Sequence, residues 1–166
     1  MLGGAHMDVL VNNAGIGSAP GSRFSAPIEE IAENMRVVYE TNVFSVVTVT
    51  NAFIPLLLRF DAGRIVNVTS KRGSIGEEGV WVGRPNMTYS SSKTALNAIT
   101  VHYARNLAAT SIKVNGAAPG HVATDFNGFR GTRTPEQGAD VAIRLAQLEK
   151  DGPTGLVSED EQQLVW

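Results

Sequence analysis

Residues 64–70 read Arg-Ile-Val-Asn-Val-Thr-Ser, and they predict a β-strand from which the rest of the fold can be worked out. Ile65, Val66 and Val68 are β-branched, and such side chains fit a strand well. Gly63 ends the helical pattern before the strand, and a glycine-rich loop follows it. The strand therefore carries two hydroxyl side chains, Thr69 and Ser70, to its carboxyl end.

A second strand is predicted on the N-terminal side, at residues 8–11. This short apolar run has no helical spacing, and it leads into the loop Asn12-Asn13-Ala14-Gly15. A helix is expected to begin with Pro27 in its first turn and to break around Thr41. Its predicted apolar face consists of Ile28, Ile31, Met35 and Val38.

The next helix, residues 43–58 and on to about Phe60, is apolar around most of its circumference. Such a helix is expected to contact the sheet on one side and another subunit on the other. The apolar run itself is too short to span a bilayer, so no membrane insertion is expected.

The C-terminal side continues the alternation of strands and helices. Residues 71–86 predict an irregular loop, and residues 88–109 predict a helix that buries Leu96, Ile99, Tyr103 and Leu107. A strand at 112–117 leads to a Pro-Gly turn. Thr134 then opens a helix with a capping box, which runs to about Glu149, and a short strand is expected near 156–157. This order predicts one α/β domain over residues 1–166, with a mainly parallel sheet and right-handed crossovers.

Composition excludes several classes of function. The 166 residues are 43% hydrophobic, enough for a single core. A net charge of −2 and a pI near 5.9, without a basic cluster, argue against binding to nucleic acid or to an anionic membrane. There is no cysteine, which is compatible with a cytoplasmic setting, and His6, His102 and His121 lack the spacing of metal ligands. No metal site is expected.

The candidate chemistry lies where three predicted loops meet. In parallel sheets, ligands bind beyond the carboxyl ends of the strands, and the loops after Val11, Val68 and Ala117 leave from that edge. Tyr89 and Lys93 are four residues apart and share one face of a helix that can reach this edge. A nearby ammonium favours phenolate, so the pKa of Tyr89 is expected to be lowered. The pair is a candidate acid/base unit, although the same spacing also arises by chance on many helices.

These features together resemble the short-chain dehydrogenase/reductase family. The resemblance rests on Asn12-Asn13-Ala14-Gly15 after a strand, Asn42, Ser70, Tyr89-x-x-x-Lys93, and Pro119-Gly120-x-x-x-Thr124. It covers Asp8 to Trp166. It implies the C-terminal part of a doubly wound, Rossmann-like parallel sheet, and an NAD- or NADP-dependent oxidoreductase that interconverts a small carbonyl compound and its alcohol. The longer segment between Ser70 and Tyr89 is similar to the carbonyl-reductase-like branch.

The resemblance also assigns roles to single residues. Tyr89 would exchange a proton with the substrate oxygen, Ser70 would hold that oxygen, and Asn42 would hold a water of a proton relay. Lys93 would bind the nicotinamide ribose and lower the pKa of the tyrosine. The remaining cofactor-lining residues implied are Asn13, Ala14, Gly15, Pro119, Gly120, Val122 and Thr124. Each motif taken singly has another interpretation. Asn12-Asn13 can belong to a plain loop, Pro119-Gly120 can form an ordinary turn, and Thr69 can be the relevant hydroxyl in place of Ser70.

One part of the family pattern is not found before Asp8. The family begins with strand-helix units and a glycine-rich phosphate loop, corresponding to roughly 60 to 90 residues. Cofactor binding is therefore expected to be weakened, and the strand at 8–11 is expected to offer an open edge for pairing. Three hypotheses follow: a shortened oxidoreductase, an inactive binding or assembly module, and one half of a split enzyme. A homo-oligomer through the helices at 43–58 and 88–109 is expected from the family resemblance.

Overall fold

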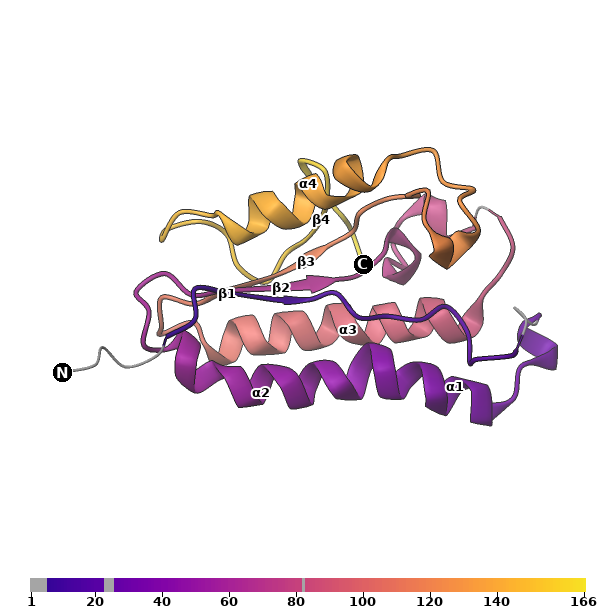
Figure 1. The fold of residues 1–166 in the computed structure, drawn as a ribbon, viewed down its shortest axis with the longest axis horizontal. Helices are drawn as coiled ribbons and strands as arrows, with labels where there is room; N and C mark the ends of the chain where they lie inside the picture. Colours follow the sequence, from indigo (N-terminus) through magenta and orange to yellow (C-terminus); the bar gives the residue numbers. More distant parts are fainter. Residues whose placement is uncertain (1–5, 23–25, 82) are drawn as a thin grey trace.

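The computed structural model describes residues 6–22, 26–81 and 83–166, and it contains one five-stranded sheet (Figure 1). The sheet order is the chain order. The strands are β1 (Val9–Asn12), β2 (Arg64–Val68), β3 (Lys113–Ala117), β4 (Val157–Glu159) and β5 (Gln162–Gln163). The first four are parallel, and β5 pairs antiparallel with β4. The predicted α/β class with a mainly parallel sheet is confirmed; the small β5 strand was not predicted.

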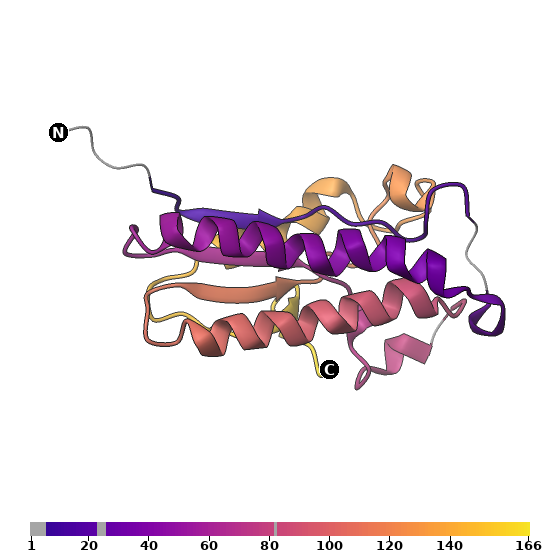
Figure 2. The same ribbon diagram turned by 90° about the horizontal axis from the view of Figure 1, so that it is seen from below.

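The helices cover both faces of the sheet. They are α1 (Ala32–Tyr39), α2 (Ser45–Leu57), α3 (Met87–Asn106) and α4 (Pro135–Ala146). Figures 1 and 2 show α1, α2 and α3 on one face and α4 on the other. Each connection from β1 to β4 moves to the next strand in the same direction. The connection through α4 therefore has the opposite hand to the two before it, and the prediction of uniformly right-handed crossovers is wrong.

The predicted helix at Pro27 is only a 3-10 turn, Pro27–Glu29, and α1 begins at Ala32. Ile28 and Ile31 are 95% and 57% exposed, so they do not form the predicted apolar face. Glu30 explains the interruption, because its backbone is extended and its carboxylate accepts a hydrogen bond from the Thr88 hydroxyl at 2.7 Å. This contact with the start of α3 ties down the segment before α1.

The predicted break around Thr41 is a π-helical turn, Glu40–Phe44, which joins α1 to α2 without interruption. The helical segment Ala32–Leu57 therefore has 26 residues, which is long and apolar enough by length and composition to cross a membrane. The helix is thus longer than the apolar run 43–58 from which no membrane insertion was expected. Val38, Asn42, Val46, Thr50 and Leu57 on this segment are nevertheless buried in the fold. They make the segment one layer of the α/β domain.

The core lies on both faces of the two central strands. Ile65, Val66 and Val114 are at most 1% exposed, as expected for parallel strands covered on both sides. The inner face of α3 is more polar than predicted. Ser92, Asn97 and Thr100 are fully buried, whereas Ile99 and Tyr103 are only partly buried. Small hydroxyl and amide side chains allow α3 to lie close to the sheet, because they find hydrogen-bond partners there.

Candidate active site

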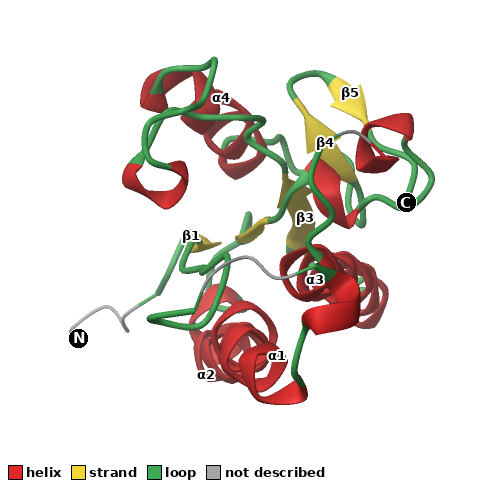
Figure 3. Ribbon diagram, turned by 90° about the vertical axis from the view of Figure 1, so that its right-hand side faces the viewer, coloured by secondary structure: helices red, strands yellow, loops and turns green. Residues whose placement is uncertain are grey.

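The register of the sheet brings three loops to one edge. Asn12 of β1 pairs with Asn67 of β2, and Val68 pairs with Ala117 of β3. All three strands therefore end at nearly the same level. Figure 3 looks onto this side of the sheet, with α3 and α4 on opposite sides of it. The predicted convergence of the loops after Val11, Val68 and Ala117 is thus confirmed.

Ser70 and Tyr89 come together at this edge. Ser70 follows β2, and Tyr89 lies in the first turn of α3, where its backbone N–H donates to the Asn86 side chain at 3.1 Å. The Ser70 hydroxyl lies beside the Tyr89 phenol, and this interaction acts to lower the pKa of Tyr89. Thr69 is 2% exposed, and its hydroxyl lies 2.5 Å from Asn97 Oδ1. Ser70, not Thr69, therefore presents its hydroxyl to Tyr89.

The pKa of Tyr89 is shifted in the direction opposite to the prediction. Burial of the phenol raises it, and this effect outweighs the lowering effects of the neighbouring Ser70 hydroxyl and the Arg72 charge. Arg72, two residues after Ser70, is a cation whose charge acts to lower the pKa of the phenol. Lys93 was expected in this role, and its ammonium lies over the ring.

Lys93 is only 4% exposed, and its ammonium lies between the sheet and the first loop. Its Nζ lies 5.7 Å from the centre of the Tyr89 ring and donates to the Val68 carbonyl oxygen at 2.8 Å. Burial lowers the pKa of Lys93 to about 8. A Cβ added to Gly15 would lie 3.3 Å from the same Nζ, so the glycine allows this approach.

Asn42 holds the loop that follows β1. It is fully buried in the π-helical turn, where its side chain accepts from the Ile16 N–H at 2.8 Å and donates to the Ile16 carbonyl at 2.9 Å. Its second amide hydrogen is donated to the Ser92 hydroxyl at 3.0 Å. One side chain thereby joins the first loop to α3. A π turn of this kind is frequent at functional sites.

The loop after β3 forms the wall of the site opposite the Ser70 loop. Gly120 has a φ of +78° and packs under Arg133, whose Nε would lie 2.9 Å from an added Cβ. The Val122 side chain packs against Gly138 of α4, so Val122 offers the site only its main chain. The Thr124 carbonyl accepts from the N–H groups of Asn127 and Phe129. Asn13 and Ala14 are exposed at the rim. Ser70, Tyr89 and Lys93 are brought together, and Asn42 contacts Ser92, the residue before Lys93.

Three further residues belong to the site but were not predicted. They are Arg72, which acts on the phenol, Ser92, which accepts from Asn42, and Phe126, whose ring centre lies 5.6 Å from that of Tyr89. Ser92 precedes Lys93 directly, and this adjacency was the only signal available for it. Nothing in the sequence distinguishes Arg72 or Phe126 from other loop residues. In the described part of the chain, no three His, Asp or Glu side chains gather as a candidate metal site.

The chain is similar in sequence to known proteins. The family described as short chain dehydrogenase matches residues 3–134. The short-chain dehydrogenase anuI of Penicillium roqueforti is 38% identical over 171 residues, which is 96% of this chain and 65% of that protein. Carbonyl reductase [NADPH] 1 of Mus musculus is 29% identical, over 96% of this chain and 70% of its own length. The chain thus spans about two thirds of the length of these two relatives.

A solved structure shows the same likeness in three dimensions. The NADPH-bound carbonyl reductase from chicken fatty liver superimposes with a TM-score of 0.84 at 26% identity. The superposition covers 98% of this chain and 67% of that protein. The arrangement of strands and helices described above is therefore that of a known fold.

Proposed function

The chain belongs to the short-chain dehydrogenase family, and on this premise we propose that it interconverts a carbonyl compound and its alcohol with NAD or NADP. One observation carries the proposal. The Ser70 hydroxyl and the Tyr89 phenol, from different elements, lie side by side at the edge where the three loops meet, and the Lys93 ammonium lies over the tyrosine ring. This is a proton donor beside a second hydroxyl that can hold the same oxygen.

The residues around this pair fit the nicotinamide half of such a cofactor. Gly15 leaves room beside the Lys93 ammonium, and Gly120 has a backbone conformation that other residues rarely adopt. We propose that the nicotinamide and its ribose are held by Asn13, Ala14, Gly15, Lys93, Pro119, Gly120, Val122 and Thr124. When bound, a nicotinamide supplies or accepts the hydride.

The chain's own residues would then manage the proton. Tyr89 would donate it to the carbonyl oxygen during reduction and take it back during oxidation, while Ser70 holds that oxygen. The Asn42 side chain uses both amide hydrogens on Ile16 and Ser92, so a relay water would be held by its main-chain oxygen. Phe126 covers the Tyr89 ring and would form part of the substrate wall. The proposed substrate class is a small carbonyl compound.

The test is an assay of the full chain with NADH and NADPH and a panel of aldehydes and ketones. The variant Tyr89→Phe should lose reduction almost completely while its thermal unfolding stays close to wild type. Tyr39→Phe in α1 is the matched control and should retain full activity. Cofactor binding is measured separately by nicotinamide fluorescence. Turnover by Tyr89→Phe at the wild-type rate would exclude the proposed acid/base role.

The outer edge of β1 favours a second candidate, in which another chain completes the cofactor site. No described strand pairs with that edge, and Val9 and Val11 are 36% and 44% exposed on it. Such an edge is a template for a further strand. A split enzyme predicts that a co-expressed strand-helix unit with a glycine-rich phosphate loop copurifies with this chain and strengthens NAD(P) binding. An assembly module predicts pairing without NAD(P) binding.

We also propose that the chain forms a homo-oligomer through α2 and α3, in a cytoplasmic setting. These helices leave a shallow hollow lined by Val47, Ile99, His102, Tyr103 and Asn106. Val49 of α2 is 38% exposed on the outer face of the fold. Light scattering should give a dimer or larger species for the wild type and a smaller one for Ile99→Glu. A monomeric wild type at the assay concentration would remove this part of the proposal.

A further inference from the structure

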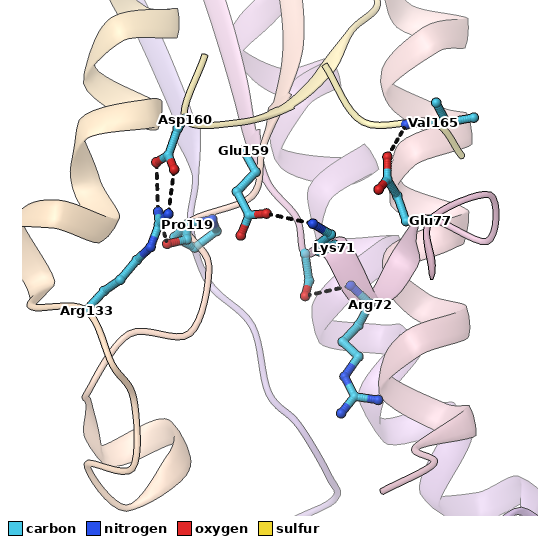
Figure 4. Close-up of polar contacts among 9 residues, drawn as sticks. Lys71, Arg72, Glu77, Pro119, Arg133, Glu159, Asp160 and Val165 are labelled. Carbon is cyan, nitrogen blue, oxygen red and sulfur yellow. Dashed lines mark hydrogen bonds and ion pairs between the residues drawn. The ribbon is translucent and has the colours of Figure 1, made fainter. Parts of the chain in front are cut away.

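The turn between β4 and β5 carries two carboxylates. One is directed toward the loop after β2 and the other toward the loop after β3, and these two loops form the walls of the candidate site. Glu159 ends β4, and Asp160 follows it with a φ of +50°. Figure 4 shows the Glu159 side chain extended toward Lys71 and the Asp160 side chain facing Arg133. These two cations belong to the loops after β2 and β3. The C-terminal hairpin thus connects segments that are otherwise far apart in the sequence.

Asp160 holds the wall formed by the loop after β3. Its two carboxylate oxygens accept from the Arg133 guanidinium at 2.7 and 2.5 Å, and the same guanidinium donates to the Pro119 carbonyl at 3.3 Å. Arg133 also lies directly on Gly120. Arg144 of α4 donates to the Asp160 main-chain oxygen. Asp160 therefore fixes the side chain on which the Pro119-Gly120 turn rests.

Glu159 holds the opposite wall. Its carboxylate lies 3.3 Å from the Lys71 ammonium, and the two side chains are 19% and 36% exposed. Lys71 directly follows Ser70 and begins the 3-10 turn Lys71–Gly73, whose Arg72 N–H donates to the Ser70 hydroxyl. A displacement of Lys71 would therefore be transmitted to the hydroxyl beside Tyr89. Farther along the tail, the Val165 N–H donates to Glu77 at 2.8 Å in the same loop.

We propose that the β4–β5 hairpin is a clamp that sets the distance between the two walls, with Glu159 positioning the Ser70 loop and Asp160 positioning the Pro119-Gly120 turn. Both act through a neighbouring cation, so they are positioning residues. Their catalytic consequence rests on the function proposed above. The Ser70 wall faces the substrate oxygen and the Pro119-Gly120 wall faces the proposed cofactor, so the two acids should affect different steps.

The structure offers matched variants for a test. Asp160→Asn removes the charge and keeps a residue that tolerates positive φ, so the turn is preserved. Glu159→Gln keeps the shape of its side chain. Glu161→Gln removes a third charge from the same turn, at an exposed residue that makes none of these contacts, and it is the control. The three variants have equal net charge, which removes any general electrostatic difference among them.

The first readout is amide hydrogen exchange, which needs no cofactor. Asp160→Asn should speed exchange at Ala123 and Arg133, whose N–H groups close the loop after β3, by about threefold to fivefold. Glu159→Gln should do the same at Arg72 and Gly73. Raising the salt concentration should move the wild type toward the variants, because salt screens ion pairs that solvent can reach. Exchange in both variants that equals that of Glu161→Gln would overturn the clamp.

The second readout is kinetic. Asp160→Asn should raise the KM for the nicotinamide cofactor more than it lowers kcat, and Glu159→Gln should lower kcat with little change in that KM. Equal changes in all three variants would contradict the assignment of one wall to each acid. If the full chain shows no turnover with either cofactor, the proposed function fails, whereas the exchange experiment still decides whether the hairpin positions the two loops.

Discussion

The Lys93 ammonium lies over the ring of Tyr89, 5.7 Å from the ring centre, and its hydrogen bond goes to the Val68 carbonyl. The cation is thus bound to the end of β2 and faces the ring. The Arg72 charge and the neighbouring Ser70 hydroxyl each act to lower the pKa of the phenol. This division of roles has consequences for the pH dependence of both activity and stability.

The first prediction concerns the pH–rate profile. Burial raises the pKa of Tyr89, and the Arg72 charge partly opposes that shift. Replacing Arg72 by Gln should therefore raise this pKa further, since a nearby cation favours phenolate. In the oxidation direction, which needs the phenolate, the rising limb of log kcat/KM should move to higher pH. Arg84→Gln in the neighbouring loop is the control, and an unmoved limb in Arg72→Gln would contradict the assignment.

The second prediction concerns stability and Lys93. Its pKa is about 8 in the folded chain against an ordinary value of 10.5, so between these values the unfolded chain binds more protons. The free energy of unfolding should therefore rise with pH in this window. Relative to Lys93→Met, the wild type should gain about 2 kcal/mol between about pH 7 and about pH 9.5. Urea unfolding at both pH values measures the gain, and a constant difference would exclude the lowered pKa.

The third prediction concerns the buried amide of Asn42. Asn42→Ala would leave the Ile16 N–H and carbonyl without their partner, and the Ser92 hydroxyl would lose one of its two hydrogen bonds. The expected loss is about 2 to 4 kcal/mol in the free energy of unfolding, because unpaired buried polar groups are costly. Asn51→Ala, which removes an exposed hydrogen bond from Tyr103, should cost less than about 1 kcal/mol by the same measurement. Equal losses would contradict the special role of Asn42.

The fourth prediction concerns the close packing of the Ser70 loop on α3. A Cβ on Gly73 would lie 2.6 Å from the backbone carbon of Lys93, which is rigid helix. Gly73→Ala should therefore destabilise the chain by about 1 to 3 kcal/mol and move the loop away from Tyr89. Gly15→Ala is the comparison, because its nearest neighbour is the movable end of Lys93. Thermal unfolding should show a clearly larger loss for Gly73→Ala; the reverse order would be inconsistent with this packing.

The fifth prediction concerns the cover over the tyrosine. Phe126 is 48% exposed, so Phe126→Ala should cost less than about 1 kcal/mol of stability. Its ring packs on Tyr89, so the same change should alter kcat/KM most for the bulkiest ketones. Phe129→Ala, from a more exposed position in the same loop, is the control. If the ratio of kcat/KM for large ketones to kcat/KM for small ketones is identical in the wild type and both variants, Phe126 is not part of the substrate wall.

The order of elements and the meeting of the loops were predictable. Residues 64–68 contain Ile65, Val66 and Val68 and are bounded by turn residues, so they predict a strand from local preferences alone. Parallel strands place their carboxyl ends at one edge whatever their exact register, so the convergence of Ser70 with the Pro119-Gly120 turn followed. Helix boundaries were less certain, and Pro27 shows why. The proline favours the first turn of a helix, but the contact between Glu30 and Thr88 holds the chain extended there, and the α-helix begins only at Ala32.

The electrostatics of the site depended on tertiary structure. Four residues of helix place Lys93 on the same face as Tyr89, but only the position of the Val68 carbonyl decides where its ammonium goes. The direction of the Tyr89 pKa shift depends on burial by segments distant in the sequence, including Phe126. The contacts from Glu159 and Asp160 join residues 88 and 27 positions apart. Local sequence patterns contain the elements and the reactive side chains, whereas desolvation and long-range pairing exist only once the chain is folded.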